Sequence, residues 1–327
     1  MTDHNDRVLI TGGSGFIGTN LVEALINDGF TVLNLDIASP RNIEHRHVWV
    51  SADIRSLVQV QAVVSEFRPD YVIHCAARTD LEGESLEDYA ANILGVENVL
   101  KASMEATGLK RIVFLSSMLV CRLGYIPSRM DEYCPDTAYG ESKVEGEYLV
   151  SKSDIHCDWT ILRPTSIWGP WFDVPYRSFF DVVSRGYFLY PNVEVRRSYG
   201  YVGNAVTQIR RVLFDKTTKF NRQTLYLCDH HPIDLYTWAK LIAESFNSRI
   251  WKVDYRLLLF LGLIGDFVRD LGWSTSPLTS RRVRNMLTSA VYDVGDLRGD
   301  LPELPFTVEH GVESTVAWMQ RSQKAEK

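Results

Sequence analysis

The sequence predicts an α/β protein in which helices cover both faces of a parallel β-sheet. Two observations carry this prediction. In the first half of the 327-residue chain, short apolar segments alternate with amphipathic segments of helical spacing. A glycine-rich segment, TGGSGFIG, directly follows the first apolar segment. Because parallel strands need crossover connections, this alternation favours a doubly wound sheet.

The expected strands are short and apolar, and they cover residues 7–11, 31–36, 47–50, 71–77, 111–116 and 159–164. Helical spacing predicts helices near 16–28, 56–66, 85–107 and 138–151. Past Pro164 the sequence is irregular and rich in proline, glycine and aromatic residues. Strand-like segments near 199–202 and 224–228 are expected to return to the sheet.

Two domains follow from this pattern. Residues 1–165, with returning segments near 199–229, are expected to form the sheet domain. Residues 166–198 and 230–327 are expected to form a smaller, mainly helical domain that closes over it and binds substrate. The longest apolar run, LLLFLGLIG at 257–265, falls short of the roughly 20 residues that span a bilayer. It predicts an amphipathic or buried helix in preference to membrane contact, with no stable membrane insertion.

Composition limits the partners and the compartment. The net charge is −6 and no dense stripe of lysine and arginine occurs, so nucleic acid is not expected as a partner. The N-terminus lacks the pattern of a signal peptide. The five cysteines have no metal-ligand or disulfide spacing, so we expect no metal site and a cytoplasmic location.

The glycine-rich segment predicts a dinucleotide site. Gly12, Gly15 and Gly18 lie between the first strand and the first helix, where glycines permit a tight turn and a pyrophosphate sits on the helix N-terminus. Asp36 ends the second strand, where a carboxylate accepts from the ribose 2′-hydroxyl and repels a 2′-phosphate. This Rossmann-type pattern favours NAD over NADP, although Arg41 could weaken the preference by folding back.

A second pattern predicts acid–base chemistry. Tyr139 and Lys143 are four residues apart on an expected helix, so both project from one face. A lysine ammonium and an oxidised nicotinamide would bring the tyrosine pKa from about 10 toward neutrality. Ser116 and Ser117 end a neighbouring strand, where a hydroxyl could hold a substrate oxygen facing Tyr139.

Together these segments resemble the extended short-chain dehydrogenase/reductases, in the nucleotide-sugar epimerase and dehydratase group typified by UDP-glucose 4-epimerase. The resemblance covers most of the chain and also includes HCAA at 74–77, NILGVENVL from 92 and LRPTSIWGP at 162–170. In this family the catalytic hydroxyl lies three residues before a valine, here Val120, which selects Ser117 over Ser116.

The resemblance implies roles for individual residues. Ser117, Tyr139 and Lys143 would be catalytic, with Tyr139 as the acid/base and Lys143 on the nicotinamide ribose. The implied cofactor-binding residues are Gly12, Gly15, Phe16, Ile17, Gly18, Asp36, Asp53, Ile54, Ala76, Ala77, Asn92, Tyr139, Lys143 and Pro164. The implied substrate-binding residues are Thr79, Ser117, Ser166 and Arg197.

The residues after Ser117 separate the possible reactions. Sugar 4,6-dehydratases of this group follow the catalytic hydroxyl with Asp-Glu, whereas this chain has Met118 and Leu119, which transfer no proton. Two reactions remain: epimerisation through a transient 4-keto sugar with NAD, which Asp36 favours, and reduction of a 4-keto sugar by NAD(P)H. A non-catalytic dinucleotide sensor and a dehydrogenase of hydrophobic alcohols such as steroids are weaker alternatives.

Several positions around the substrate depart from the family pattern. Cys121-Arg122 replaces a usual Tyr-Gly, Ser166 replaces a common asparagine, and Val202-Gly203-Asn204 replaces Val-x-Asp. Arg197, with Arg196 beside it, stands where the family often binds a diphosphate. A nucleotide-diphosphate sugar is therefore the expected substrate, without its sugar being specified. The resemblance also implies a homodimer, paired through the helices near 85–107 and 138–151 as a four-helix bundle.

Overall fold

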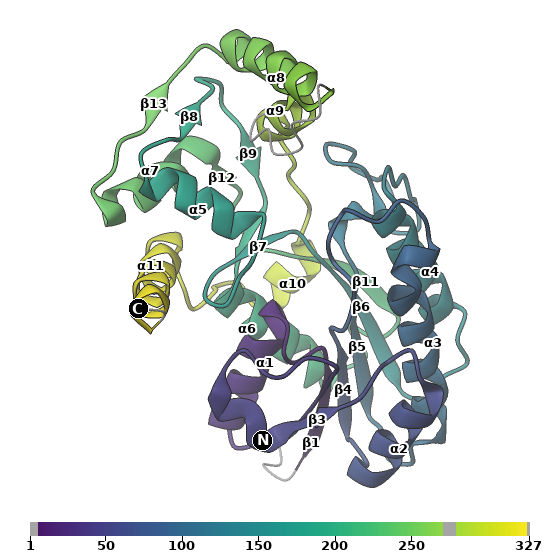
Figure 1. Ribbon diagram of the computed structural model, residues 1–327. Helices are drawn as coiled ribbons and strands as arrows, with labels where there is room; N and C mark the ends of the chain where they lie inside the picture. Colours follow the sequence, from purple (N-terminus) through teal and green to yellow (C-terminus); the bar gives the residue numbers. More distant parts are fainter. Residues whose placement is uncertain (1–5, 271–278, 326–327) are drawn as a thin grey trace.

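A computed structural model describes residues 6–270 and 279–325. Seven parallel strands form one sheet in the order β11-β6-β5-β4-β1-β2-β3 (Figure 1). The strands are β1 (Arg7–Thr11), β2 (Thr31–Asp36), β3 (Trp49–Ser51), β4 (Tyr71–His74), β5 (Arg111–Leu115), β6 (Asp158–Pro164) and β11 (Gln223–Leu227). The strand order reverses between β1 and β4, and ligands of such sheets bind at this switch point.

Helices cover both faces of the sheet, so the predicted doubly wound fold is confirmed. One face carries α1 (Phe16–Asn27) and α6 (Val202–Leu213), and the other carries α2 (Leu57–Phe67), α3 (Ala90–Glu105) and α4 (Ala138–Ser151) (Figure 1). A separate apolar core fills each side of the sheet. The strands are apolar on both faces because both faces are buried.

Some element boundaries differ from the prediction. A 3₁₀ turn at Ile43–Val48 delays β3, and β4 ends at His74. A second 3₁₀ turn, Glu87–Tyr89, precedes α3. The expected return of residues 199–202 to the main sheet is wrong, because β10 (Tyr199–Tyr201) pairs with β7 (Ser166–Trp168) in a separate sheet. The expected return of residues 224–228 is confirmed, because β11 pairs with β6 at the edge of the sheet.

The C-terminal part is mainly helical, as predicted. Its helices are α5 (Tyr176–Ser184), α7 (Leu235–Phe246), α8 (Tyr255–Asp270), α9 (Ser280–Leu287), α10 (Gly295–Asp300) and α11 (Val308–Ala325). Two-residue strands form the pairs β8 (Leu189–Tyr190) with β13 (Trp251–Lys252) and β9 (Arg196–Arg197) with β12 (Ile233–Asp234). Trp168 and Trp238 are fully buried there and pack with tilted rings, whose centroids are 5.4 Å apart.

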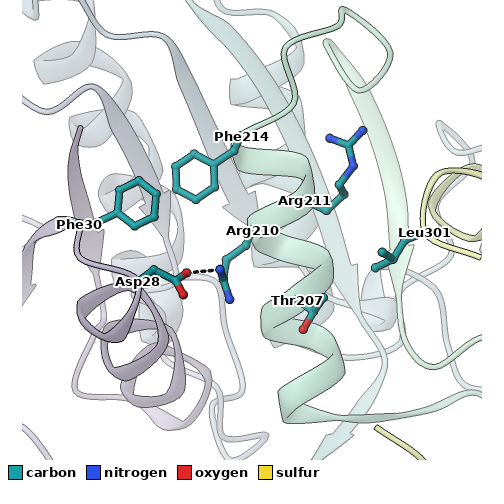
Figure 2. Close-up of a pocket in the computed structure, with 7 residues that line it drawn as sticks. All are labelled: Asp28, Phe30, Thr207, Arg210, Arg211, Phe214 and Leu301. Atoms are coloured by element: carbon teal, nitrogen blue, oxygen red, sulfur yellow. Dashed lines mark ion pairs between the residues drawn. The ribbon is translucent and has the colours of Figure 1, made fainter. Parts of the chain in front are cut away.

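A cavity of about 480 Å³ lies between the end of α1 and α6 (Figure 2). Phe30 and Phe214 stack beside it, and Arg210 forms an ion pair with Asp28. Phe30 directly precedes β2, which places the cavity at the amino ends of the strands. Since ligands of this fold bind at the carboxyl ends, this cavity is not the cofactor site.

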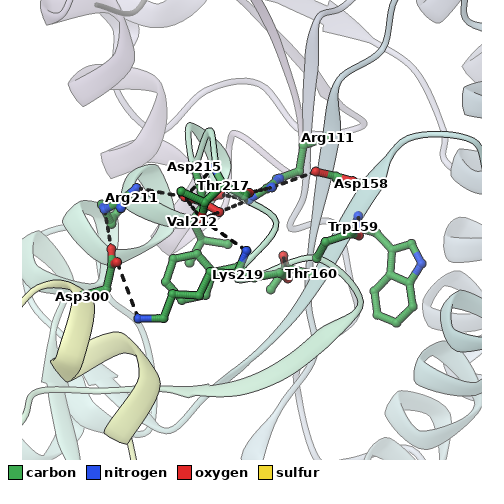
Figure 3. Close-up of polar contacts among 12 residues, drawn as sticks. Arg111, Asp158, Trp159, Thr160, Arg211, Val212, Asp215, Thr217, Lys219 and Asp300 are labelled. Atoms are coloured by element: carbon green, nitrogen blue, oxygen red, sulfur yellow. Dashed lines mark hydrogen bonds and ion pairs between the residues drawn. The ribbon is translucent and has the colours of Figure 1, made fainter.

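A buried ionic network ties the amino end of β5 to α6 (Figure 3). Arg111 is 2% exposed. Its guanidinium donates to the carbonyl of Val212 at 2.6 Å and to Asp158 at 2.9 Å, and it lies 3.6 Å from Asp215. Thr217 also donates to Asp215, at 2.9 Å. Arg111 and Arg211, the latter 3.5 Å from Asp215, therefore together compensate a carboxylate that has no exposed surface.

We expect Arg111→Met to lower the free energy of unfolding by about 1–3 kcal/mol, because the carbonyl of Val212 loses its donor and Asp215 is left with its ion pair to Arg211, at 3.5 Å. Urea denaturation measures the change. Arg129→Met is the matched control, since Arg129 pairs with Asp131 on the exposed surface, and it should leave the midpoint nearly unchanged. Equal midpoints for the two variants would contradict the stabilising role of Arg111.

Candidate active site

The glycine-rich loop packs directly on the end of β4. Gly12 has φ +74°, and a Cβ there would lie 2.5 Å from the backbone nitrogen of Ala76. A Cβ on Gly18 would collide with the carbonyl oxygen of Gly12. Both positions therefore require glycine, for conformation at the first and for close approach at the second.

The start of α1 presents its free amide groups at this loop. Gly15 is the N-cap, and no side chain caps the helix there. Phe16 and Ile17 begin the helix and are half-buried. An uncapped helix N-terminus beside close-packed glycines fits a pyrophosphate, because its N–H groups and positive dipole end attract anions.

Asp36 lies across the same loop. Its carboxylate accepts from the amides of Ser14 at 3.0 Å and Ala38 at 2.9 Å, which fixes its orientation. Arg41 does fold back, donating to the carbonyl of Ser14 at 3.1 Å, but its charge pairs with Asp173 at 2.6 Å. A 2′-phosphate here would be repelled by the Asp36 carboxylate, and Arg41 would not offset this because its charge is paired with Asp173. The geometry therefore favours NAD.

We expect Asp36→Asn to weaken NAD binding by about tenfold, because a charged hydrogen-bond acceptor for the ribose becomes neutral. The discrimination against NADP should shrink at the same time, since no carboxylate repels the 2′-phosphate. Calorimetric titration with both dinucleotides measures the two affinities. Glu44→Gln, which neutralises a carboxylate on the exposed turn after β2, is the control. An unchanged NAD-to-NADP ratio in Asp36→Asn would contradict this role.

The other expected cofactor residues lie at or after the carboxyl ends of β3, β4 and β6, or on α3. Asp53 is half-exposed and is held by Arg55, whose hydrogen bonds lower the pKa of the carboxyl. Ile54 is buried against α3. Asn92 accepts from the amide of Arg78 at 2.7 Å and donates to Ser142 at 2.9 Å, so it ties the chain after β4 to α4. Ala76 and Ala77 are half-buried in that chain, Thr79 is exposed there, and Pro164 ends β6.

Tyr139 and Lys143 lie on α4 next to Ser117. Thr137 caps this helix, accepting from the amide of Gly140 at 3.0 Å. The Ser117 hydroxyl is within hydrogen-bonding reach of Tyr139. The ammonium of Lys143 donates to the carbonyl of Leu115, at the end of β5, at 3.0 Å. The three side chains are thus held at the junction of β5 and α4.

Burial acts on both titratable groups. It raises the pKa of the Tyr139 phenol to about 12 and lowers the pKa of the Lys143 ammonium to about 8. Each shift disfavours the charged form, as desolvation does. A phenolate at Tyr139 near neutral pH therefore requires further positive charge, which an oxidised nicotinamide supplies when it is bound.

The two serines at the end of β5 have different partners. Ser116 donates to Glu147 at 2.5 Å. Ser117 accepts from the amide of Leu119 at 3.1 Å and is buried beside Tyr139. The Ser116 hydroxyl therefore makes an interior hydrogen bond, whereas the Ser117 hydroxyl faces Tyr139. This geometry supports the choice of Ser117.

Three features of the site were not predicted. Glu147 and Arg163 form a buried ion pair with an N–O distance of 2.7 Å directly behind Ser116. Thr11 and His74 are hydrogen-bonded at 2.7 Å, and burial lowers the pKa of the histidine to about 3, so the ring is neutral. Tyr89 packs edge-on against Tyr139, with ring centroids 5.8 Å apart. Glu147 was not predicted to lie in the site because its charge suggested an exposed position on the helix.

The expected substrate residues are less closely gathered. Ser166 is buried in β7. The guanidinium of Arg197 donates to the carbonyls of Thr288, at 3.0 Å, and Asn285, which hold it against the end of α9. Arg196 is exposed. A diphosphate at Arg197 would therefore share the guanidinium with these carbonyls.

A sequence model of the NAD dependent epimerase/dehydratase family matches residues 8–225. The chain belongs to this family. An N-acetyl-alpha-D-glucosaminyl-diphospho-ditrans,octacis-undecaprenol 4-epimerase of Escherichia coli O157:H7 is 26% identical over 322 residues, covering 96% of this chain and 95% of the relative. A 3 beta-hydroxysteroid dehydrogenase/Delta 5→4-isomerase of Mycobacterium tuberculosis is 30% identical over 270 residues, covering 76% of this chain and 72% of the relative.

Solved structures support the same fold. The Thermus thermophilus UDP-glucose 4-epimerase in complex with NAD superposes with a TM-score of 0.70 at 21% identity, covering 96% of this chain and 99% of that chain. The resemblance to the extended short-chain dehydrogenase/reductases and the expectation of an enzyme with NAD as cofactor are confirmed by family membership. The glycine loop, the open start of α1 and Asp36 fit that cofactor.

Proposed function

We propose that this enzyme is a 4-epimerase of nucleoside-diphosphate sugars that acts through a transient 4-keto sugar. One observation carries the proposal: Ser117, Tyr139 and Lys143 meet beside the dinucleotide site, while the next two residues are apolar. Met118 and Leu119 form the 3₁₀ turn after Ser117. With neither an acid nor a base there, the site supports oxidation and reduction at one carbon and does not support water elimination.

The roles of the side chains follow from their contacts. NAD supplies the hydride acceptor when it is bound. Tyr139 takes the proton of the C4 hydroxyl as the ketone forms and returns it afterwards, with Ser117 holding the C4 oxygen. Lys143 stabilises the phenolate and is placed to bind the nicotinamide ribose. Between the two steps the sugar must turn over, so that the hydride returns to the opposite face of C4, while the diphosphate stays bound. We assign the binding of the substrate during this step to Ser166, Thr79 and Arg197.

An epimerase recycles its bound cofactor, whereas a ketoreductase consumes a reduced cofactor, and this difference separates the two reactions. Mass spectrometry of nucleotide released from fresh protein should show NAD, and NMR should show C4 epimers formed from UDP-hexoses without added cofactor. Empty protein that turns over a 4-keto sugar only with added NADH or NADPH would replace epimerisation with reduction. The E. coli relative is named for a sugar on a diphospho-undecaprenol, so the same assay is run with a polyprenyl-diphosphate sugar.

A steroid alcohol dehydrogenase is the second candidate. The observation in its favour is the 30% identity to the mycobacterial 3 beta-hydroxysteroid dehydrogenase. Its reaction would consume NAD, so absorbance of NADH growing with a 3β-hydroxysteroid would support it. Absence of that signal, with epimer formation from a UDP-hexose, would exclude it.

We also propose that the chain forms a homodimer in the cytoplasm. Leu94 and Met104 on α3 and Tyr148 on α4 are large apolar side chains that are 40–45% exposed. The two helices pack on each other, so a second copy could complete a four-helix bundle. Sedimentation at micromolar concentration should give a dimer, and Leu94→Glu should give a monomer. A monomeric native protein would contradict the proposal.

A further inference from the structure

Helix α8 carries an apolar face turned toward solvent. The predicted helix at 257–265 is present within it, yet its apolar residues are not buried as a group. Five large side chains on this helix are 43–65% exposed: Leu257, Phe260, Leu263, Ile264 and Phe267. Positions 257, 260, 264 and 267 follow the spacing of one helix face. We call these five residues the α8 face.

The opposite side of α8 is packed, so the orientation of the face is fixed. Leu258 is fully buried. A Cβ on Gly262 would lie 3.0 Å from the Cα of Ser280 and 3.2 Å from Val283, which shows how closely α9 approaches. Figure 1 shows α8 at the outer end of the molecule, with α9 beneath it. The α8 face is therefore held outward by contacts on its other side.

Cationic and aromatic side chains accompany the α8 face. Arg256 on α8 and Arg281 and Arg284 on α9 are exposed. Among the described side chains of these two helices, Asp266 is the one acid, and it accepts from the amide of Ser280. Asp254, directly before α8, is also exposed. Arg256 has the helical spacing of positions 260, 263 and 267, so it lies on the α8 face.

Three exposed aromatic residues lie on α8, on the preceding strand β13, or beside that strand. Trp251 is 54% exposed and donates to the carbonyl of Gly186, next to Tyr187, which is 72% exposed. Tyr255 begins α8. Tryptophan and tyrosine are favoured where an apolar layer meets water, because each ring has an apolar body and a polar tip.

We propose that the α8 face docks on the surface of an anionic lipid bilayer. Apolar side chains with arginines and aromatic residues beside them are the composition of helices that lie in the membrane interface. A second copy of this chain is a poorer occupant, because pairing two such ends would bring the same arginines together. No described helix is long and apolar enough to cross a membrane, and α8 has 16 residues, so the mode is surface docking.

The segment at the end of α9 contacts Arg197 and the loop after the Ser117 turn. The guanidinium of Arg197 donates to the carbonyls of Asn285 and Thr288 at the end of α9. A Cβ placed on Gly124 would lie 2.7 Å from the side chain of Thr288. Gly124 lies in the loop that follows the Ser117 turn. The proposal does not rest on the reaction assigned above.

Vesicle co-sedimentation of the full chain tests the docking. The native protein should pellet with vesicles that contain phosphatidylglycerol, and less with phosphatidylcholine alone or as NaCl is raised. Phe260→Ser/Phe267→Ser should lower the partition coefficient by about tenfold or more, because two aromatic side chains no longer leave water. Arg256→Gln should weaken binding severalfold and reduce its salt dependence.

The control replaces two exposed valines elsewhere, Val58→Ser/Val193→Ser, and should pellet as the native protein does. All variants should keep the native thermal midpoint and NAD affinity, since the replaced side chains are exposed. Native protein that stays in the supernatant with phosphatidylglycerol vesicles would overturn the proposal. So would full binding by the phenylalanine variant. Conversion of a dimer to a monomer by that variant, without vesicle binding by the native protein, would assign the face to a second copy instead.

Discussion

Tyr139→Phe should lower kcat for C4 epimerisation by about 10³-fold, because removal of a general acid/base costs factors of this order. Only the phenolic hydroxyl is lost, and the ring keeps its buried packing against Tyr89. NAD affinity should therefore change little. Turnover of a UDP-hexose by NMR and calorimetric titration with NAD separate the two effects.

Tyr187→Phe is the matched control, because it removes the same hydroxyl from a side chain that is 72% exposed. It should keep native turnover of the soluble substrate. A Tyr139→Phe variant with most of its activity would contradict the assignment of Tyr139 as the acid/base. Loss of NAD binding together with activity would instead make the hydroxyl part of the cofactor site.

Arg163→Met should lower the free energy of unfolding by about 3–5 kcal/mol, the cost of leaving a buried carboxylate without its partner. Arg163 has no exposed side-chain surface, and Glu147 is 2% exposed. The guanidinium donates to both carboxylate oxygens, at 2.8 and 2.7 Å. The hydroxyls of Ser116 and Tyr133, which also donate to Glu147, cannot neutralise its charge.

The double variant Glu147→Gln/Arg163→Met separates charge from packing. It removes both charges, so it should be more stable than Arg163→Met alone, even though it carries one more substitution. Urea denaturation of the native protein, of the single variants Glu147→Gln and Arg163→Met, and of the double variant gives the coupling. Additive losses, or a loss below about 1 kcal/mol in Arg163→Met, would contradict a role for this pair in supporting the end of β5.

The sheet was predictable because its strands are buried on both faces and appear in the sequence as continuous apolar segments. The site was predictable where the local structure or chemistry requires one residue type. Gly12 needs a positive φ, and Asp36 ends a strand beside the glycine loop. Helix α6 was missed, although Val202, Val206 and Ile209 follow helical spacing, because the preceding aromatic and proline residues suggested irregular chain.

Tertiary contacts decided the remaining features. The sheet edge is occupied by the five-residue β11, whereas the three-residue β10 pairs with β7. Glu147 and Arg163 look like surface charges in the sequence, and only their meeting behind Ser116 shows otherwise. The exposed face of α8 could not be distinguished from a buried one, because an apolar run does not say what covers it.

In the proposed epimerisation, the same hydrogen leaves C4 and returns to C4 within one binding event. Incubating the enzyme with a UDP-hexose deuterated at C4, without added nucleotide, tests it most directly. We predict that NMR and mass spectrometry will show the C4 epimer with its deuterium retained. Loss of the deuterium to solvent or to free reduced nucleotide, or product formed only when reduced nucleotide is added, would contradict epimerisation by Tyr139, Ser117 and Lys143.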